Sequence, residues 1–184
     1  MTQSTHQVNE PSEWVARFAR LIPARGAALD LACGSGRHAR LLAGLGFAVT
    51  AIDRDGAALA SLEGINGIGT LCADLEGAAW PFAGAGFDAV VVTHYLHRPL
   101  FPFIFDVLRP GGVLIYETFA LGNELLGRPS NREFLLQPGE LLERVSGRLA
   151  VIAFEQGRVE RPKPAVLQRI CAVRGGMENV RIDS

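Results

Sequence analysis

The sequence predicts an α/β protein built around a mainly parallel sheet. Five short apolar runs of strand length recur along the first two thirds of the chain, and segments with apolar residues at helical spacing lie between them. Buried strands that alternate with helices are typical of a parallel sheet that helices cover on both faces. The five predicted strands are Ala27–Leu31, Phe47–Ile52, Ile68–Ala73, Phe87–Thr93 and Val113–Thr118.

Helical segments are predicted before, between and after these strands. In the first of them Ser12 is a plausible N-cap, and Trp14 and Phe18 recur at the spacing of one helix face. Glycines and prolines mark the ends of several others. The predicted helices are Ser12–Leu21, Arg37–Ala43, Asp55–Glu63, Pro99–Leu108 and about Pro138–Val145.

The last third of the chain has a different pattern. Arg148–Phe154 and Ala165–Val173 read as strands, and only about ten residues with several turn formers separate them. A parallel crossover needs a dozen residues or more, so we predict an antiparallel hairpin at the sheet edge. After Gly175 we expect a disordered tail.

Length and composition indicate one soluble domain. The chain has 184 residues, 48% hydrophobic and 20% charged. We expect a single domain with a core from about residue 12 to residue 175 and flexible tails. No run approaches the roughly 18 apolar residues of a membrane span, and Met1–Pro11 lacks the pattern of a signal peptide. These features predict a cytoplasmic protein without membrane attachment.

The net charge of −1 gives no overall basic field for nucleic acid. A local basic cluster lies in the last third, and acidic residues are interleaved with it, so a solvated face is favoured over an RNA contact. The basic residues are Arg144, Arg148, Arg158, Arg161, Lys163, Arg169 and Arg174, and the acidic ones are Glu143, Glu155 and Glu160.

The cysteines and histidines predict neither a disulfide framework nor a metal site. Cys33, Cys72 and Cys171 are odd in number and far apart, without zinc spacing. His94 and His97 stand three residues apart, but no third ligand lies near them in the sequence.

Three features at successive strand ends predict a site for an adenosine-containing cofactor. The loop Gly34-Ser35-Gly36 joins a strand to a helix, where glycine permits a tight turn and close approach of a ligand. Asp53 ends the next strand, where a carboxylate can accept both ribose hydroxyls. Asp74 follows the third strand, within reach of an adenine edge. Alone, the loop is equally a ligand-free turn, and each aspartate is equally a helix cap.

Both NAD and S-adenosylmethionine (SAM) contain adenosine. Gly34, Gly36 and Ala39 satisfy the loose dinucleotide fingerprint. However, Asp30 closes the strand before the loop, and its carboxylate would repel a pyrophosphate at the helix start. A carboxylate there suits the positively charged amino-acid end of SAM. Together with the predicted terminal hairpin, Asp30 favours SAM over NAD, which remains the alternative.

The ordered motifs resemble those of the class I SAM-dependent methyltransferases over about residues 12–175. Residues 28–36 resemble the first signature of that family, and residues 49–53 resemble its ribose-binding strand. The other matching segments are Cys72-Ala73-Asp74-Leu75 at the adenine-binding turn, Trp80-Pro81-Phe82 after it, Phe87–Val92 as the fourth strand and Leu108–Gly112 before the fifth.

The resemblance implies a doubly wound, seven-stranded sheet with a final antiparallel strand, and an in-line attack of an acceptor on the sulfonium methyl. Asp30 would hold the amino group of SAM, the two glycines would make room for its methionine portion, and Arg54 would flank the adenine. The implied cofactor-binding residues are Asp30, Ala32, Gly34, Gly36, Asp53, Arg54, Asp74, Leu75 and Thr93.

The acceptor is expected to meet the segment after the fourth strand. Residues 93–98 lack the Asp/Asn-Pro-Pro-Tyr/Phe turn that enzymes acting on base or amide nitrogens often carry. His94 or Tyr95 would orient or deprotonate the acceptor, or would serve only in packing. Further candidates for acceptor contacts are Arg98, Glu117, Arg128, Asn131 and Arg132.

The segment 127–136, together with His97-Arg98-Pro99, resembles small bacterial methyltransferases of the tellurite-resistance type. The sequence shows no added substrate domain, which favours a small acceptor such as a thiol, a chalcogen oxyanion or a small metabolite. Nucleic acid is the second choice of acceptor. A non-catalytic, SAM-binding partner subunit is the alternative to an enzyme.

Overall fold

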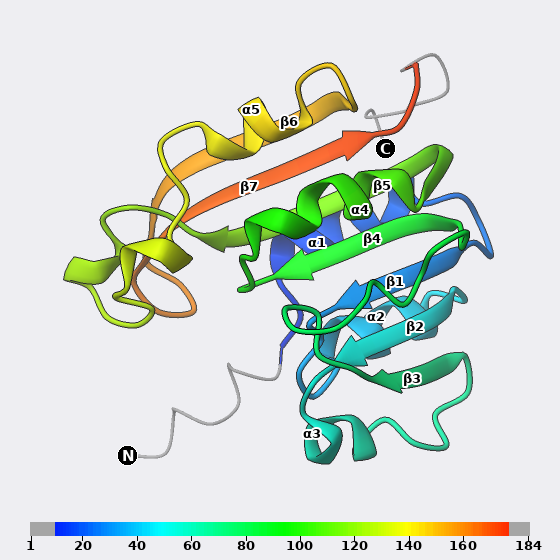
Figure 1. The fold of residues 1–184 in the computed structure, drawn as a ribbon. Coiled ribbons are helices and arrows are strands. Elements are labelled where there is room, and N and C mark those ends of the chain that lie inside the picture. The colour runs from blue at the N-terminus through cyan, green and yellow to red at the C-terminus, as the bar shows by residue number, and fades with distance from the viewer. Residues whose placement is uncertain (1–9, 177–184) are drawn as a thin grey trace.

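A seven-stranded sheet forms the centre of the computed structural model, which describes residues 10–176 (Figure 1). The strands lie in the order β3-β2-β1-β4-β5-β7-β6. The pairs among β1 to β5 are parallel, whereas β7 is antiparallel to both β5 and β6. The strands are β1 (Ala27–Leu31), β2 (Ala48–Asp53), β3 (Ile68–Cys72), β4 (Phe87–Thr93), β5 (Leu108–Phe119), β6 (Ala150–Val159) and β7 (Ala165–Val173).

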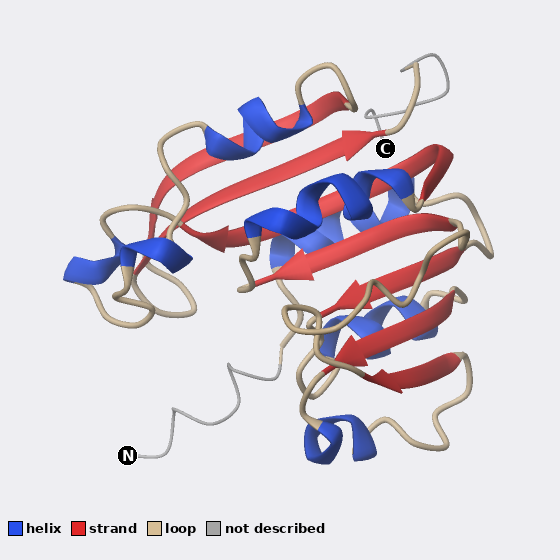
Figure 2. Cartoon of the chain, in the orientation of Figure 1, coloured by secondary structure: helices blue, strands red, loops and turns tan. Residues whose placement is uncertain are grey.

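Helices cover both faces of this sheet (Figure 2). The α-helices are α1 (Glu13–Phe18), α2 (Arg37–Gly44), α3 (Gly56–Ala60), α4 (Phe101–Asp106) and α5 (Glu140–Val145). Short 3-10 helices are η1 (Ala19–Leu21), η2 (Arg98–Leu100), η3 (Asn123–Leu125) and η4 (Arg132–Phe134). The fold class and the C-terminal antiparallel hairpin are therefore confirmed.

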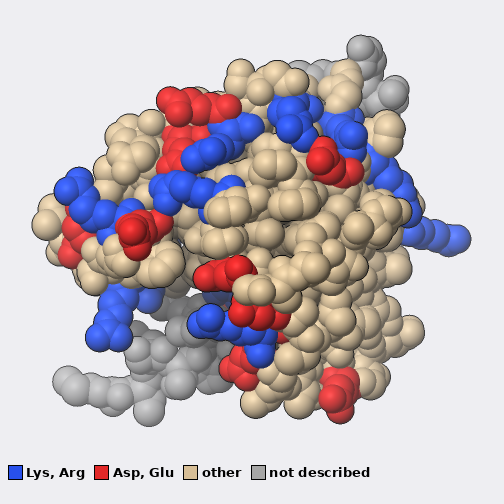
Figure 3. Space-filling view, viewed as in Figure 1, with Lys and Arg blue, Asp and Glu red and all other residues tan. Residues whose placement is uncertain are grey.

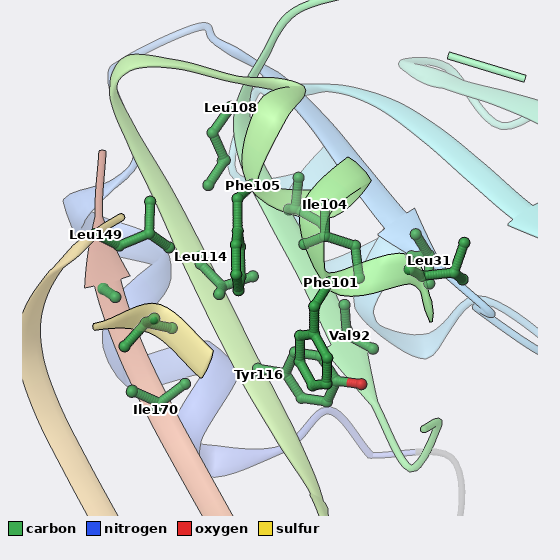
Figure 4. Close-up of a cluster of buried hydrophobic side chains, with 14 of the residues drawn as sticks. Leu31, Val92, Phe101, Ile104, Phe105, Leu108, Leu114, Tyr116, Leu149 and Ile170 are labelled. Atoms are coloured by element: carbon green, nitrogen blue, oxygen red, sulfur yellow. The ribbon is translucent and has the colours of Figure 1, made fainter. Parts of the chain in front are cut away.

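Side chains alternate along each strand between two cores, because successive residues of a strand point to opposite faces. Val90 and Val92 of β4 pack with α4 and α5, in the cluster that Figure 4 shows with Phe101 of α4 against Tyr116 of β5. Ala89 and Val91 pack on the other face with α1, α2 and α3.

Element boundaries differ from the predictions in two informative places. The fourth predicted helix reaches Leu108, but α4 ends at Asp106, and Leu108 is the first residue of β5. That strand starts early because Leu108 pairs with Phe87 before an irregularity in the register. At the hairpin, β6 continues through Gly157 to Val159, beyond the predicted end at Phe154.

Most of the tail for which disorder was predicted, from residue 177 onward, lies outside the described residues. Within residues 10–176, no helix is both long enough and apolar enough to span a bilayer.

Candidate functional site

A cleft of about 390 Å³ lies beyond the carboxyl ends of the parallel strands. It brings together seven residues that the sequence places in a site: Ala32, Asp53, Arg54, Asp74, Leu75, His94 and Tyr95. The other residues of its lining are Ala73, Glu76, Leu96, Thr118, Phe119, Pro129 and Phe134. Strand ends that are far apart in sequence thus meet at one cleft, as the order of the sheet requires.

The glycine loop between β1 and α2 forms one end of this region. Gly34 and Gly36 have φ angles of +55° and +74°, in the left-handed region that glycine adopts without steric cost. A Cβ on Gly34 would meet no atom within 4 Å, so the space beside it is open. A Cβ on Gly36 would lie 2.4 Å from Leu62. Gly34 therefore leaves room for a ligand, whereas Gly36 packs closely against Leu62.

Asp53, the last residue of β2, ties two backbone segments together. Its Oδ2 accepts a 2.7 Å hydrogen bond from the Gly34 amide, and its Oδ1 accepts a 2.9 Å bond from the Asp55 amide. Each carboxylate oxygen retains acceptor capacity, since an ionised carboxylate offers about four lone-pair positions. Asp53 therefore fixes the glycine loop while it lines the cleft.

Asp30 lies beneath the loop and does not line the cleft. Its side chain points toward α2, where Oδ2 accepts a 2.8 Å bond from the Ala39 amide, while the buried Oδ1 has no partner among the described residues. Burial raises the pKa of this carboxyl to about 7. An unsatisfied buried acceptor below an open glycine loop fits a cationic group bound above it, directly or through water.

Thr93, at the end of β4, is held by a buried histidine. The Ser12 amide donates to His38 Nε2 at 3.0 Å, so the proton of the neutral ring is on Nδ1 and is donated to the Thr93 hydroxyl at 3.2 Å. Burial lowers the pKa of His38 to about 3, which keeps the ring neutral. Thr93 does not line the cleft, but its hydroxyl proton stays available to another acceptor.

His94 and Tyr95 both line the cleft. The ring of His94 stacks on Phe119, with ring centroids 4.8 Å apart, and its Nδ1 lies 3.3 Å from Arg37 Nη2. The Tyr95 hydroxyl is buried and lies close to the carboxylate of Glu76. Burial, followed by the negative charge of Glu76, raises the pKa of Tyr95, so its hydroxyl is neutral and able to bind a ligand.

The residues expected to contact the acceptor are mostly occupied elsewhere. Arg98 forms a bidentate ion pair with Glu140 and donates to the carbonyls of Glu133 and Leu135. Glu117 is buried against Arg169 at 3.4 Å. Arg98 and Glu117 form contacts within the fold and are not among the residues that line the cleft.

Asn131 caps η4, because its side-chain oxygen accepts a hydrogen bond from the Glu133 amide. Arg128 is exposed and precedes Pro129, whose ring lines the cleft. Arg128 is thus the sequence neighbour of a cleft residue but does not itself line the cleft. Arg132 lies in a separate surface groove beside Arg98.

The interleaved charges of the last third form ion pairs, and acidic and basic side chains alternate on the face in Figure 3. Arg144 pairs with Glu140, Arg148 with Asp106 and Arg158 with Glu160. This mixture agrees with a solvated, salt-bridged face. Within residues 10–176, no three His, Cys, Asp or Glu side chains are grouped as metal ligands would be.

The ion pairs around Glu140 predict a pH dependence of stability. Burial alone would raise the pKa of Glu140, but hydrogen bonds from Arg98, the Gln137 amide and Arg144 outweigh it and lower the pKa to about 2. The stabilisation is therefore present above the unfolded-state pKa of about 4.5 and is lost as the pH falls toward 2. We expect Glu140→Gln to lower the free energy of unfolding at pH 7 by about 1–3 kcal/mol.

Urea unfolding of Glu140→Gln and the parent from pH 7 to pH 2 measures this effect. The exposed Glu143 of the same helix supplies the matched control, Glu143→Gln. An equal loss in both variants, or parallel pH curves for Glu140→Gln and the parent, would contradict the assignment.

Several residues that line the cleft were not predicted from the sequence. Thr118 ends the fifth predicted strand and Phe119 directly follows it, so their position at the carboxyl end was an available signal. Pro129 and Phe134 come from a loop that is distant in sequence from the glycine loop, and no sequence pattern fixes how it folds over the cleft. Glu76 directly follows the adenine-turn resemblance, and its amide donates to Asp74.

Comparisons with known proteins point to methyltransferases. The profile of a family described as "Methyltransferase domain" matches residues 28–112, which span β1 to the start of β5 and include Asp30, Asp53 and Asp74. A search of curated protein sequences finds no match. Residues 28–112 thus resemble a methyltransferase domain, and the sheet with its antiparallel β7 has the fold of the SAM-dependent methyltransferases named below.

Among solved structures, TehB from Haemophilus influenzae superposes with a TM-score of 0.75 at 21% identity, over 90% of this chain and 63% of that one. This chain thus spans less than two thirds of TehB. A SAM-dependent methyltransferase from Methanosarcina mazei gives a TM-score of 0.68 at 18% identity, over 90% and 99% of the two chains. An S-adenosylmethionine-dependent methyltransferase from Mesorhizobium loti gives 0.66 at 21% identity, over 88% and 97%.

Proposed function

We propose that this chain is a single-domain enzyme that transfers the SAM methyl group to a small-molecule acceptor in the cleft. The observation that carries the proposal is the convergence of Asp53, Asp74 and Tyr95 on one cleft beside the open glycine loop. Its volume of about 390 Å³ falls in the range of small-ligand sites. Basic residues of the last third are engaged in ion pairs, which favours a small acceptor over RNA.

Different residues along the cleft would bind the ribose, the adenine and the methionine portion of SAM. Asp53 would accept hydrogen bonds from the ribose hydroxyls, and Arg54 and Leu75 would flank the adenine. Asp74 would accept from the adenine amine, and Ala32, Gly34 and Thr93 would border the methionine portion. When bound, SAM supplies an electrophilic methyl group on a positively charged sulfur.

The remaining part of the lining would hold the acceptor. His94 and Phe119 form a stacked pair there, and Pro129 and Phe134 close the same part from the loop. These side chains would align the acceptor and exclude water, and alignment of two reactants can contribute about 7–11 kcal/mol to a barrier. The structural likeness to TehB supports placement near the tellurite-resistance-type enzymes.

Asp53→Asn is expected to weaken SAM binding about a hundredfold, because hydrogen bonds to a charged acceptor contribute about 1.5–3 kcal/mol. Asparagine keeps one oxygen for the Gly34 amide, so the loop should stay in place. Isothermal calorimetry with SAM and with S-adenosylhomocysteine measures the change. Asp88→Asn, a change of the same kind at the opposite ends of the strands where Asp88 pairs with Arg109, is the matched control.

An equal SAM affinity for Asp53→Asn and the parent would remove Asp53 from the site. If SAM binds normally, a screen of thiols, oxyanions, small metabolites and tRNA with methyl-labelled SAM tests transfer by the isolated chain. Transfer to tRNA alone would overturn the small-molecule proposal. Binding of SAM with no transfer to any acceptor would favour a non-catalytic partner subunit.

A further inference from the structure

Arg37 connects the glycine loop to the acceptor part of the cleft. It is the first residue of α2, directly after Gly36, and its Nη2 lies 3.3 Å from Nδ1 of His94. A guanidinium is always a donor, so Nδ1 of His94 accepts this hydrogen bond. A neutral imidazole carries one proton, and that proton must then be on Nε2.

We infer that Arg37 is a positioning residue, which holds the His94 ring with its proton on Nε2 so that His94 donates a hydrogen bond to the methyl acceptor. In this arrangement His94 does not remove a proton from the acceptor. The position of the proton on the His94 ring follows from the contact with Arg37 alone. The hydrogen bond from His94 to an acceptor rests on the proposed function.

The orientation of the His94 ring is fixed from two further directions. The ring stacks on Phe119 at an interplanar angle of 25°. The backbone of His94 has a φ of +53°, in the left-handed region that is unfavourable for residues other than glycine. The His94 amide donates to the Glu117 carbonyl at 2.9 Å and anchors this turn to β5. Strain that the surrounding structure maintains in this way is common at functional sites.

The surroundings of His94 keep its ring neutral. Although His94 is solvent-exposed on one side, desolvation of its ring in the cleft, followed by the positive charges of Arg37 and Lys163, lowers the pKa of His94 to about 4. His38 lies close enough to be coupled to His94, and its own pKa is also lowered. A ring with so low a pKa is a weak proton acceptor at neutral pH.

This assignment restricts the chemical class of the acceptor. The acceptor needs a lone pair that can take the Nε2 hydrogen bond. It must also react without losing a proton to His94, as a thiolate or an oxyanion does. An alcohol or another acceptor that needs deprotonation by His94 is not expected to react.

The test is nitrogen NMR of the histidine rings in the full chain, without SAM or an acceptor. The signals of His94 are assigned from the spectrum of His94→Asn. In the parent we expect Nδ1 to be unprotonated and Nε2 to carry the proton. In Arg37→Gln we expect both tautomers and a rise of the His94 pKa by about one unit toward its ordinary value.

Arg40→Gln is the matched control, since Arg40 lies three residues further along α2 and donates to the Ser61 carbonyl instead. It removes the same charge and should leave the His94 signals unchanged. A parent spectrum with the proton on Nδ1 would overturn the inference, as would equal His94 titration in Arg37→Gln and the parent. If Arg37→Gln does not fold, a proton on Nδ1 in the parent still overturns the inference.

Calorimetry with SAM on the same samples separates this inference from the proposed function. A parent that shows the Nε2 proton but binds no SAM would contradict the function and leave the role of Arg37 on the ring intact. A parent that binds SAM with the proton on Nδ1 would contradict the role of Arg37 and leave the function intact.

Discussion

Gly36→Ala is expected to destabilise the protein by about 2–5 kcal/mol. The new Cβ would lie 2.4 Å from a Leu62 methyl carbon, and Leu62 is fully buried in the core between α2, α3 and the sheet. Alanine would also have to adopt a φ of +74°, which costs roughly 1–2 kcal/mol by itself. The free energy of unfolding from urea titration, monitored by tryptophan fluorescence, measures the loss.

Gly34→Ala separates packing from ligand space. A Cβ there meets nothing within 4 Å, so only the cost of the left-handed backbone, roughly 1–2 kcal/mol, should reduce stability. The same Cβ would project into the space left for SAM and should reduce its affinity more than it reduces stability. If Gly36→Ala is as stable as Gly34→Ala, the role of Gly36 in packing is wrong.

The parts of the fold that were predictable depend on local sequence periodicity. The five parallel strands follow from apolar runs, and the hairpin follows from the short, turn-rich connection before β7. The start of β5 was not predictable, because Leu108 joins the sheet through its pairing with Phe87. That pairing is a tertiary contact, which overrides the helical appearance of Pro99–Leu108.

In the candidate site, too, residues at strand ends were predictable, whereas contacts that depend on tertiary packing were not. Asp53 and Asp74 stand at the ends of strands, and the topology of a parallel sheet brings such residues to one edge. Residue type alone does not give the partners of Arg98 and Glu117, because the ion pairs with Glu140 and Arg169 depend on how distant segments pack. The stacking of Phe119 on His94 likewise depends on three-dimensional packing.

The buried carboxyl of Asp30 is expected to reduce the stability of the protein at neutral and higher pH. Because its folded pKa of about 7 lies above the ordinary value of 3.8, its contribution to stability is fully present below pH 3.8 and is lost as the pH rises to 7. Asp30→Asn has no ionisable carboxyl, so its stability does not fall as the pH rises to 7. Its side-chain oxygen can still accept from the Ala39 amide. The amide nitrogen would take the buried position that now lacks a partner, at a cost of about 1–3 kcal/mol.

We therefore expect Asp30→Asn to be more stable than the parent above pH 7, by roughly 1–3 kcal/mol, and equal or less stable below pH 4. We also expect it to bind SAM at least tenfold more weakly, since the carboxylate that would balance the cationic end of SAM is gone. In the parent, SAM affinity should rise with pH between about 5.5 and 7 as Asp30 ionises, and in Asp30→Asn this rise should vanish. Calorimetry across that pH range measures both effects, and an unchanged affinity with an unchanged pH profile would place Asp30 in folding alone.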